Sequence, residues 1–173
     1  MVRGVCTYPL CSMAGLRNFY IIFSVLVMFS CFPHKHQSRL PSECIFCSIG
    51  EHSATRIVYQ DEDVIAFHDI KPAANTHLLV VPTRHIGTVK SLRKEDYELV
   101  QKMKVVGQRL LREQGYSEDN IRLGFHIPPF NSIDHLHLHC LGLPFRNWWI
   151  GGKYSRNTPL WFNSIDTILE KLK

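Results

Sequence analysis

One stretch decides the fold: Asp134-His135-Leu136-His137-Leu138-His139-Cys140-Leu141. Histidines alternate here with apolar residues. Successive side chains of a β-strand point to opposite faces, so a strand would place the three imidazoles on one face and the apolar side chains on the other. A helix would turn the rings about 200° apart at each two-residue step and give them no common target. The stretch therefore predicts a strand with one histidine face and one core face.

Three imidazoles on one strand face suit three kinds of chemistry. They can bind a metal ion, bind a phosphate, or supply a nucleophile whose neighbours act as acid and orienting group. The alternative is a histidine-rich edge strand without a chemical role. Three buried polar rings on one face are costly to a folded chain unless they are used, so we favour a chemical role.

The stretch resembles the signature of the histidine triad nucleotide hydrolases and transferases, in which three histidines alternate with apolar residues. A second block also resembles this family: Phe67-His68-Asp69-Ile70-Lys71-Pro72, then Thr76-His77-Leu78-Leu79-Val80-Val81-Pro82, then Arg84-His85-Ile86. Two motifs in the expected order make the chain similar to the Hint branch, and most similar to its third paralogue. The resemblance covers residues 44–172.

The pattern of the chain predicts an α+β fold. Apolar residues at helical spacing predict a long helix over 94–114, ended by Gly115, and Ser164 or Asn163 can cap a final helix over 164–172. Shorter patterns predict a helix over 44–49, strands over 56–60, 64–67, 77–81, 121–127 and 135–143, and a loop at Gly151-Gly152. Short turns between strands favour an antiparallel sheet. The resemblance implies the histidine triad fold, a five-stranded antiparallel sheet with a long helix and a C-terminal helix, and dimerisation.

Residues 1–40 differ in composition from the rest of the chain. We expect them to form a hydrophobic or disordered extension, followed by the histidine triad domain over 41–173. Residues 19–32 are an almost unbroken apolar run, but a membrane-spanning helix needs roughly 17–25 such residues. The run has about the length of a signal-peptide hydrophobic region, although no cleavage site is clear. Three alternatives remain for this segment: a membrane anchor through 19–32, a leader without a targeting role, or a segment that is not natively translated.

The overall charge and the cysteines limit the class of protein. A formal charge of +5 permits binding of anionic small molecules but is too small to indicate a nucleic-acid partner. Three of the six cysteines lie in the first 31 residues, so the six do not suggest a disulfide framework, and a reducing compartment is expected. We expect a protein of the cytoplasm, and also of the nucleus, that is not bound to membranes.

The resemblance implies a role for each residue around the phosphate. His137, the middle histidine, would be the nucleophile, because a neutral imidazole with a pKa of about 6.5 is a good nucleophile at neutral pH. His139 would bind the phosphate and manage the leaving-group proton, His77 would lie near the phosphate, and Ser132 would reach the phosphate or the leaving group. A backbone carbonyl in the strand of the second motif would orient the nucleophile. The alternatives are packed strand histidines and a turn serine.

The resemblance also implies a nucleotide site. Asp69 would accept the ribose hydroxyls, because a carboxylate suits two vicinal hydroxyls. The base would be lined by Phe67, His68 and Ile70, with ordinary core packing as the alternative. Further nucleotide contacts would come from His126, His135, Leu136 and His137.

The sequence departs from the Hint pattern before the triad. Phe130-Asn131 stands where a Gly-Gln pair usually precedes the serine. Gly124-Phe125-His126 stands where an asparagine usually lies upstream. This Gly-Phe-His form is similar to aprataxin, a relative that deadenylates DNA.

A second set of residues suits a structural zinc ion. A lone C-x-x-C pair is weak evidence by itself. Several members of the family bind zinc through such a pair, the histidine of an Arg/Lys-x-His-Ile segment and the first triad histidine, which correspond here to Cys44, Cys47, His85 and His135. This Cys₂His₂ set suits tetrahedral zinc, and two thiols with two structural histidines are the alternative. The chemistry itself is expected to need no cofactor.

The resemblance implies an adenosine 5'-monophosphoramidase. Such an enzyme splits the P–N bond of AMP-linked amines such as AMP-lysine, and also acyl- or aminoacyl-adenylates, through a covalent AMP–histidine intermediate. Expected partners are purine nucleotide conjugates and further copies of the chain in a homodimer or larger oligomer. Alternatives are an aprataxin-like DNA 5'-adenylate hydrolase, a Fhit-like dinucleoside polyphosphate hydrolase and a nucleotide-binding adaptor. Turnover on an AMP-amine separates enzyme from adaptor, and adenylated nicked DNA separates the phosphoramidase from the deadenylase.

Overall fold

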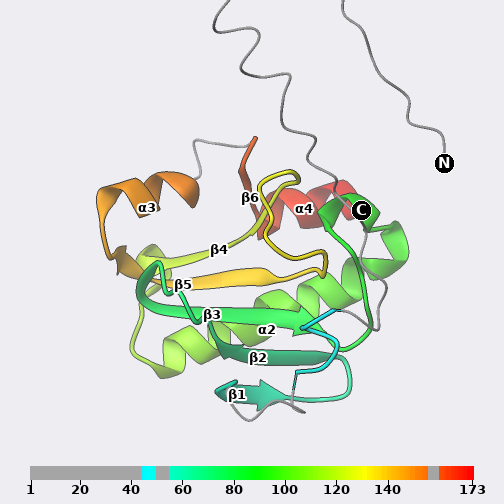
Figure 1. Cartoon of the computed structure of the whole chain (residues 1–173), viewed down its shortest axis with the longest axis horizontal. Coiled ribbons are helices and arrows are strands. Elements are labelled where there is room, and N and C mark those ends of the chain that lie inside the picture. The colour runs from blue at the N-terminus through cyan, green and yellow to red at the C-terminus, as the bar shows by residue number, and fades with distance from the viewer. Residues whose placement is uncertain (1–43, 50–54, 156–159) are drawn as a thin grey trace, which may run out of the picture. The chain divides into compact units, whose positions relative to one another are not determined.

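A six-stranded antiparallel sheet forms the centre of the computed structural model, which describes residues 44–49, 55–155 and 160–173 (Figure 1). Its strands are β1 (Ile57–Gln60), β2 (Val64–His68), β3 (Ala74–Pro82), β4 (Ile121–His126), β5 (Leu138–Phe145) and β6 (Phe162–Ser164). Their order across the sheet is β1-β2-β3-β5-β4-β6. The helices are α2 (Tyr97–Glu113), α3 (Trp148–Lys153) and α4 (Ile165–Leu172), with 3₁₀ turns at Val89–Ser91, Lys94–Asp96 and Glu118–Asn120. The predicted α+β class and antiparallel pairing are confirmed.

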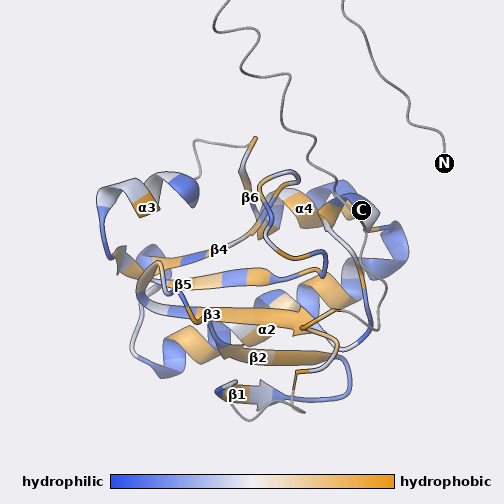
Figure 2. Cartoon of the chain, viewed as in Figure 1, coloured by the Kyte–Doolittle hydropathy of each residue, from blue (hydrophilic) through white to orange (hydrophobic). Residues whose placement is uncertain are grey.

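The strand that carries the triad lies in the middle of the sheet. β5 pairs with β3 on one side and β4 on the other, and His139 stands opposite both Leu79 and Gly124. Leu138 and Cys140 belong to the main core beside α2, so the residues that alternate with them point to the other face. Figure 2 shows strands β2 and β3 as strongly apolar. The prediction of one core face and one histidine face is confirmed for the part of the motif that lies in β5, which holds His139, whereas His135 and His137 precede the strand.

The long helix α2 covers the core face of the sheet. Val100, Met103, Val106 and Leu110 are buried at helical spacing, as the sequence predicts. The first predicted turn is a 3₁₀ turn at Lys94–Asp96, so the α-helix itself begins at Tyr97. The chain leaves the helix through Gly115, whose φ of 87° lies in the left-handed region that glycine adopts without strain.

The sixth strand was not predicted. β6 pairs with β4 through Gly124↔Ser164, Phe125↔Asn163 and His126↔Phe162. A Cβ atom at position 124 would collide with the carbonyl of Asn163 and the ring of Phe162, so glycine permits this close approach. A strand of three residues is too short to show an alternating pattern, which is why the five-stranded prediction was wrong.

Three local predictions were also wrong. Residues 44–49 form turns instead of a helix. The Gly151-Gly152 pair lies inside α3, because the side chain of Asn147 accepts a hydrogen bond from the Ile150 N–H (2.9 Å) and caps that helix. The triad strand begins at Leu138, and the segment before it is held by a hydrogen bond from the Leu136 N–H to the Ile86 carbonyl (2.6 Å).

In the part of the chain that the structure describes, no helix is long and apolar enough to cross a membrane. Residues 1–40, with the apolar run 19–32 and the predicted domain boundary at residue 41, lie outside the described residues. The expectations for that segment stay predictions.

Candidate active site

Four histidines gather on the sheet face opposite α2. His77 comes from β3, His126 from β4 and His139 from β5, while His137 comes directly before β5. The neighbours of His77 and His139 along their strands, such as Leu78 and Cys140, belong to the core on the other face. Pairing of β3, β5 and β4 therefore brings rings from three strands side by side.

Three of these rings form a hydrogen-bonded chain. The Ala73 N–H donates to Nδ1 of His77 (3.1 Å), His77 Nε2 lies 2.9 Å from His139 Nδ1, and His139 Nε2 lies 3.0 Å from His126 Nδ1. A backbone amide can only donate, so Nδ1 of a neutral His77 must accept and its proton must lie on Nε2. Each following ring then accepts at Nδ1 and donates from Nε2. Both nitrogens of His139 are thus occupied by other histidines.

The rings of this chain are neutral at physiological pH. Burial lowers the pKa of His77 to about 4, although the carboxylate of Asp69, 3.5 Å from Nδ1, opposes the shift. Burial also lowers the pKa of His126 to about 4 and lowers that of His139 well below its ordinary value. The neighbouring histidines add to each shift, because like charges in a desolvated cluster repel.

His137 is held in a different way. Its Nδ1 lies 2.6 Å from the backbone carbonyl of His135. A carbonyl can only accept, so the proton lies on Nδ1 and the lone pair on Nε2. Burial lowers the pKa of His137, which keeps the ring neutral. The sequence placed the orienting carbonyl in the strand of the second motif, and this was wrong: the carbonyl comes from the triad segment itself.

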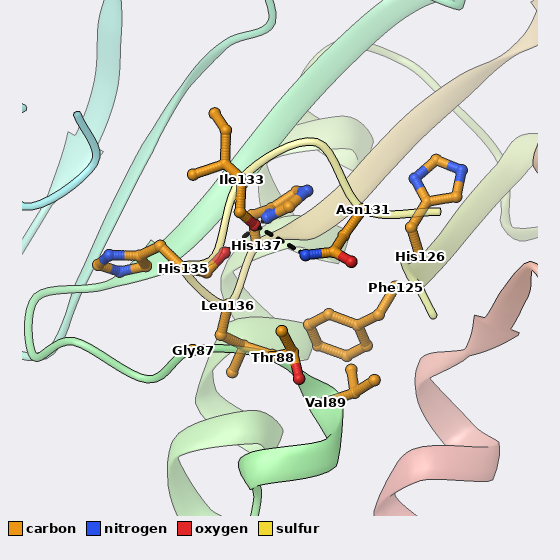
Figure 3. Close-up of a pocket in the computed structure, with 10 residues that line it drawn as sticks. All are labelled: Gly87, Thr88, Val89, Phe125, His126, Asn131, Ile133, His135, Leu136 and His137. Atoms are coloured by element: carbon orange, nitrogen blue, oxygen red, sulfur yellow. Dashed lines mark hydrogen bonds between the residues drawn. The ribbon is translucent and has the colours of Figure 1, made fainter. Parts of the chain in front are cut away.

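A small pocket adjoins the nucleophile candidate (Figure 3). Its lining residues are Gly87, Thr88, Val89, Phe125, His126, Asn131, Ile133, His135, Leu136 and His137. Asn131 Nδ2 donates to the Ile133 carbonyl (3.2 Å) and to the Asp134 carboxylate (2.8 Å), which fixes the orientation of the amide. Its Oδ1 is buried without a hydrogen-bond partner among the described residues. Asn131 was not among the candidate site residues.

Tyr154 covers the chain of histidines. Its ring centroid lies 5.7 Å from that of His77, 4.9 Å from His126 and 5.3 Å from His139. Burial raises the pKa of Tyr154 to about 12, so the phenol is neutral. The ring shields the imidazoles from water. The sequence offered no signal for this residue, because its place depends on α3, where a loop was predicted.

The predicted metal ligands converge. One ligand atom from each of Cys44, Cys47, His85 and His135 lies within 4.8 Å of the other three. Cys44 Sγ and Cys47 Sγ lie 3.3 and 3.5 Å from His135 Nδ1, and Cys47 Sγ lies 3.3 Å from His85 Nδ1. His135 Nε2 donates to the Pro82 carbonyl (2.9 Å), which leaves Nδ1 as a lone pair facing the thiols. This group can hold a metal ion.

Comparison with known proteins places the chain in a family. Residues 43–154 match a family model described as scavenger mRNA decapping enzyme C-term binding. The chain is 51% identical over 134 residues to the bifunctional adenosine 5'-phosphosulfate phosphorylase/adenylylsulfatase HINT4 of Arabidopsis thaliana, covering 75% of this chain and 91% of that relative. It is 39% identical over 136 residues to the mouse adenosine 5'-monophosphoramidase HINT3, covering 76% and 82%.

Solved structures agree with these relatives. A HIT family hydrolase from Legionella pneumophila superposes with a TM-score of 0.56 at 36% identity, covering 61% of this chain and 96% of that one. A histidine triad protein from Clostridium difficile superposes with a TM-score of 0.57 at 29% identity, covering 64% and 99%. The chain belongs to the histidine triad superfamily. It is a hydrolase of the Hint branch, as its two motifs predict.

The predicted site residues of this histidine triad hydrolase do not all lie together. His77, His126, His137 and His139 share one face, and the Asp69 carboxylate lies beside His77. Phe67 is buried, His68 is half-buried and Ile70 is 89% exposed. Ser132 is exposed and is not among the pocket-lining residues, whereas its neighbours Asn131 and Ile133 are.

The neutral histidines should make the protein less stable in acid. The folded-state pKa of His77 and His126, about 4, lies below the ordinary value of 6.5, so between these pH values the unfolded chain binds protons that the folded chain does not. Stability then falls as pH drops below about 6.5, by about 2 kcal/mol per ring down to pH 5, at 1.36 kcal/mol per pH unit. Urea unfolding at pH 7 and pH 5 measures this loss. It should be smaller in His126→Phe, and an equal loss in both proteins would contradict the assignment.

Proposed function

We propose that this histidine triad hydrolase splits the P–N bond of AMP-linked amines through a covalent AMP–His137 intermediate. The observation that carries the proposal is the orientation of His137, whose Nδ1 donates to the His135 carbonyl (2.6 Å) and whose Nε2 keeps its lone pair. The names of the HINT3 relatives, adenosine 5'-monophosphoramidases, support the same reaction.

The reaction would proceed in two halves. His137 Nε2 attacks the α-phosphorus, the P–N bond breaks and the amine leaves; water then splits the P–Nε2 bond and releases AMP. We propose that Asp69 accepts the ribose hydroxyls, while Phe67, His68 and Ile70 lie along the base and Leu136 and His135 complete the nucleotide contacts. His77 and His139 would lie beside the phosphate. No cofactor takes part in these steps.

Asn131 bears on the choice of leaving group. Its Oδ1 is a buried acceptor without a partner among the described residues, and it belongs to a side chain that lines the pocket beside His137 (Figure 3). A leaving amine that carries an N–H would satisfy this acceptor. A sulfate leaving group, as the name of the HINT4 relative implies for that enzyme, offers only acceptors. Asn131 thus favours an amine leaving group. Adenylylsulfatase activity is the second candidate function, because the chain is 51% identical to that relative.

A pair of substrates tests this preference. AMP-propylamide carries the N–H and AMP-N-methylpropylamide does not. The wild type should therefore cleave the first about 5- to 150-fold faster, because leaving a buried acceptor unsatisfied costs roughly 1–3 kcal/mol. In Asn131→Leu this ratio should fall toward one. Asn131→Leu also loses the hydrogen bonds of Asn131 to Ile133 and Asp134, which can lower activity in general. The ratio of the two cleavage rates cancels such a general loss. A wild-type ratio near one, or faster cleavage of adenosine 5'-phosphosulfate, would favour the second candidate.

We also propose that Cys44, Cys47, His85 and His135 bind a structural zinc ion. Zn–S and Zn–N bonds of about 2.3 and 2.1 Å in a tetrahedron place sulfur and nitrogen about 3.6 Å apart. The observed S···N distances of 3.3–3.5 Å fit that geometry. The hydrogen bond from His135 to Pro82 fixes the ring, as metal-bound histidines require. When bound, the ion would join the turn at Cys44–Ile49 to the triad segment.

Two properties of the whole chain stay proposals. We propose that residues 41–173 suffice for the fold, because the described elements begin near Cys44. A homodimer through α2 and a sheet edge rests on the family resemblance alone. Light scattering of the full chain and of a variant lacking residues 1–40 tests both.

A further inference from the structure

All three tryptophans of the chain lie within residues 148–161, and all three are exposed. The exposed fractions are 74% for Trp148, 71% for Trp149 and 43% for Trp161. A folded domain usually buries most of a tryptophan, because the indole is a large apolar ring. Two neighbouring indoles that stand almost free in water therefore indicate a surface that binds a partner.

The helix that carries the first two tryptophans is packed on the sheet by its other face. Ile150 of α3 and Tyr154, four residues later, pack against the small buried cluster around Leu141. The rings of Trp148 and Trp149 instead stack on each other, with centroids 4.1 Å apart and planes inclined by 26°. The inner face of α3 thus serves the fold, and the outer face presents the tryptophan pair.

The surroundings of the pair are positively charged. Residues 135–165 contain no aspartate or glutamate, but they contain Arg146, Lys153 and Arg156. Arg146 and Lys153 are exposed, and they stand on either side of the tryptophans along the chain. The overall charge of +5 has the same sign. The charge of this surface therefore complements an anionic partner.

We propose that α3 is a docking surface for anionic lipid membranes. The two indoles enter the interface between headgroups and acyl chains, and Arg146 and Lys153 contact acidic headgroups. Tryptophan is enriched at this interface because its ring is apolar while its N–H can still donate a hydrogen bond. Each basic side chain near such a surface raises the affinity by about fivefold. The proposal departs from the expectation of a protein that is not bound to membranes, since an interfacial surface needs no spanning helix.

A single-stranded nucleic acid is the other anionic partner that aromatic and basic side chains can bind, because bases stack on exposed rings. In α3, however, each indole of the pair covers one face of the other. The pair is then one compact apolar block instead of two separate stacking platforms. A block of this kind suits insertion between lipids, so the membrane is the favoured partner.

The position of α3 does not depend on the exposed side chains of this surface. The backbone N–H of Arg146 donates to the Ala73 carbonyl (2.9 Å), and the Asn147 side chain caps the helix. At the end of α3, the backbone of Lys153 forms a hydrogen bond with His126. Substitution of the exposed side chains therefore leaves these bonds, and the helix, in place.

Tryptophan fluorescence reports on this surface directly. In the full chain with Trp161→Phe, the remaining tryptophans are Trp148 and Trp149, and the apolar run 19–32 contains none. The probes are vesicles of phosphatidylcholine, alone or mixed with phosphatidylserine, with and without bromine-labelled acyl chains. With the mixed vesicles we expect the emission to shift to shorter wavelength and the bromine to quench it, because the indoles leave water for the interface. Binding through residues 19–32 alone would leave both indoles in water.

Two matched charge variants, both built on Trp161→Phe, test the role of the cations. Arg146→Gln/Lys153→Gln should weaken binding to the mixed vesicles by about 25-fold, the product of two fivefold effects. Lys171→Gln/Lys173→Gln removes the same charge from exposed side chains at the end of α4, which lies across the view from α3 in Figure 1. It should weaken binding by less than about twofold, because salt screens charges beyond about 10 Å. Circular dichroism checks that each variant is folded.

Each result bears on the proposal. A shift and quenching with the mixed vesicles that the α3 variant weakens and the α4 variant keeps would support it. Unchanged emission with the mixed vesicles, equal effects with phosphatidylcholine alone, or equal weakening in both charge variants would overturn it. Quenching by a single-stranded oligonucleotide but not by the vesicles would also overturn it, and would make α3 a nucleic-acid surface.

Discussion

Replacing His137 by alanine or asparagine is expected to slow hydrolysis of AMP-amines by about 10⁴-fold or more, because no other described group offers an unprotonated nitrogen positioned for attack on phosphorus. His137 Nδ1 donates to the His135 carbonyl, which leaves the lone pair on Nε2. The rings of His77, His139 and His126 are hydrogen-bonded to one another. Loss of the ring removes a bond-forming atom, whereas other residues of the site adjust only the rate of bond formation. Single-turnover kinetics on AMP-propylamide measures the effect.

Binding and trapping experiments give this prediction its controls. AMP should bind His137→Asn with nearly wild-type affinity, because the residues proposed to contact the ribose and the base, Asp69, Phe67, His68 and Ile70, lie outside the triad segment. Wild-type enzyme quenched without acid should carry AMP on the peptide that contains His137. AMP found on His139 or His77, or a variant that keeps a tenth of the wild-type rate, would show that the nucleophile is a different group.

Removing the proposed zinc ligands should have the second largest effect. The double variant Cys44→Ser/Cys47→Ser should lose about one zinc per chain, measured by elemental analysis of protein purified without chelators. Structural zinc contributes about 10–16 kcal/mol of binding free energy in zinc-finger peptides, so we expect the unfolding midpoint in urea to fall sharply. The effect is large because the ion would join residues that lie 91 positions apart, Cys44 and His135.

Cys140 provides the matched control for the zinc experiment. Its thiol is fully buried in the core beneath β5, and burial raises its pKa well above the ordinary value, so it has no part in metal binding. Cys140→Ala should keep the full zinc content. Two results would contradict the zinc proposal: zinc retained in the double cysteine variant, or a wild-type protein that binds no zinc when zinc is supplied. The four residues would then be two thiols and two structural histidines without a metal.

Most of the fold follows from periodicity. The long helix shows a period of about 3.6 and the triad stretch a period of 2, while the strands over 64–67 and 77–81 are short apolar runs bounded by turn residues. Both the elements and their antiparallel pairing could therefore be predicted. β6 could not, because three residues carry no period and their pairing depends on the missing side chain of Gly124. α3 was missed for a related reason: two glycines argue for a loop, and the cap from Asn147 outweighs them only in the folded context.

The site was predictable where motif spacing defines it. The two motifs named His77, His137 and His139, and the resemblance joined a separate C-x-x-C pair to two of their histidines as potential metal ligands; the structure brings each set together. Asn131 and Tyr154 were missed because their positions depend on how two loops return to the sheet, which no local pattern encodes. His126 was assigned to the nucleotide, and its hydrogen bond to His139 could be seen only after β4 and β5 were paired.

His135 contributes two different groups to the two sites. Its ring faces Cys44 and Cys47, while its backbone carbonyl orients His137. If zinc holds that ring, the orientation of the His137 imidazole depends on whether the metal is bound, although the ion takes no part in the chemical steps. Kinetic constants measured in buffers that contain a chelator or a thiol oxidant would then report a mixture of loaded and unloaded enzyme. Assays of this hydrolase should therefore be run at a defined free zinc concentration.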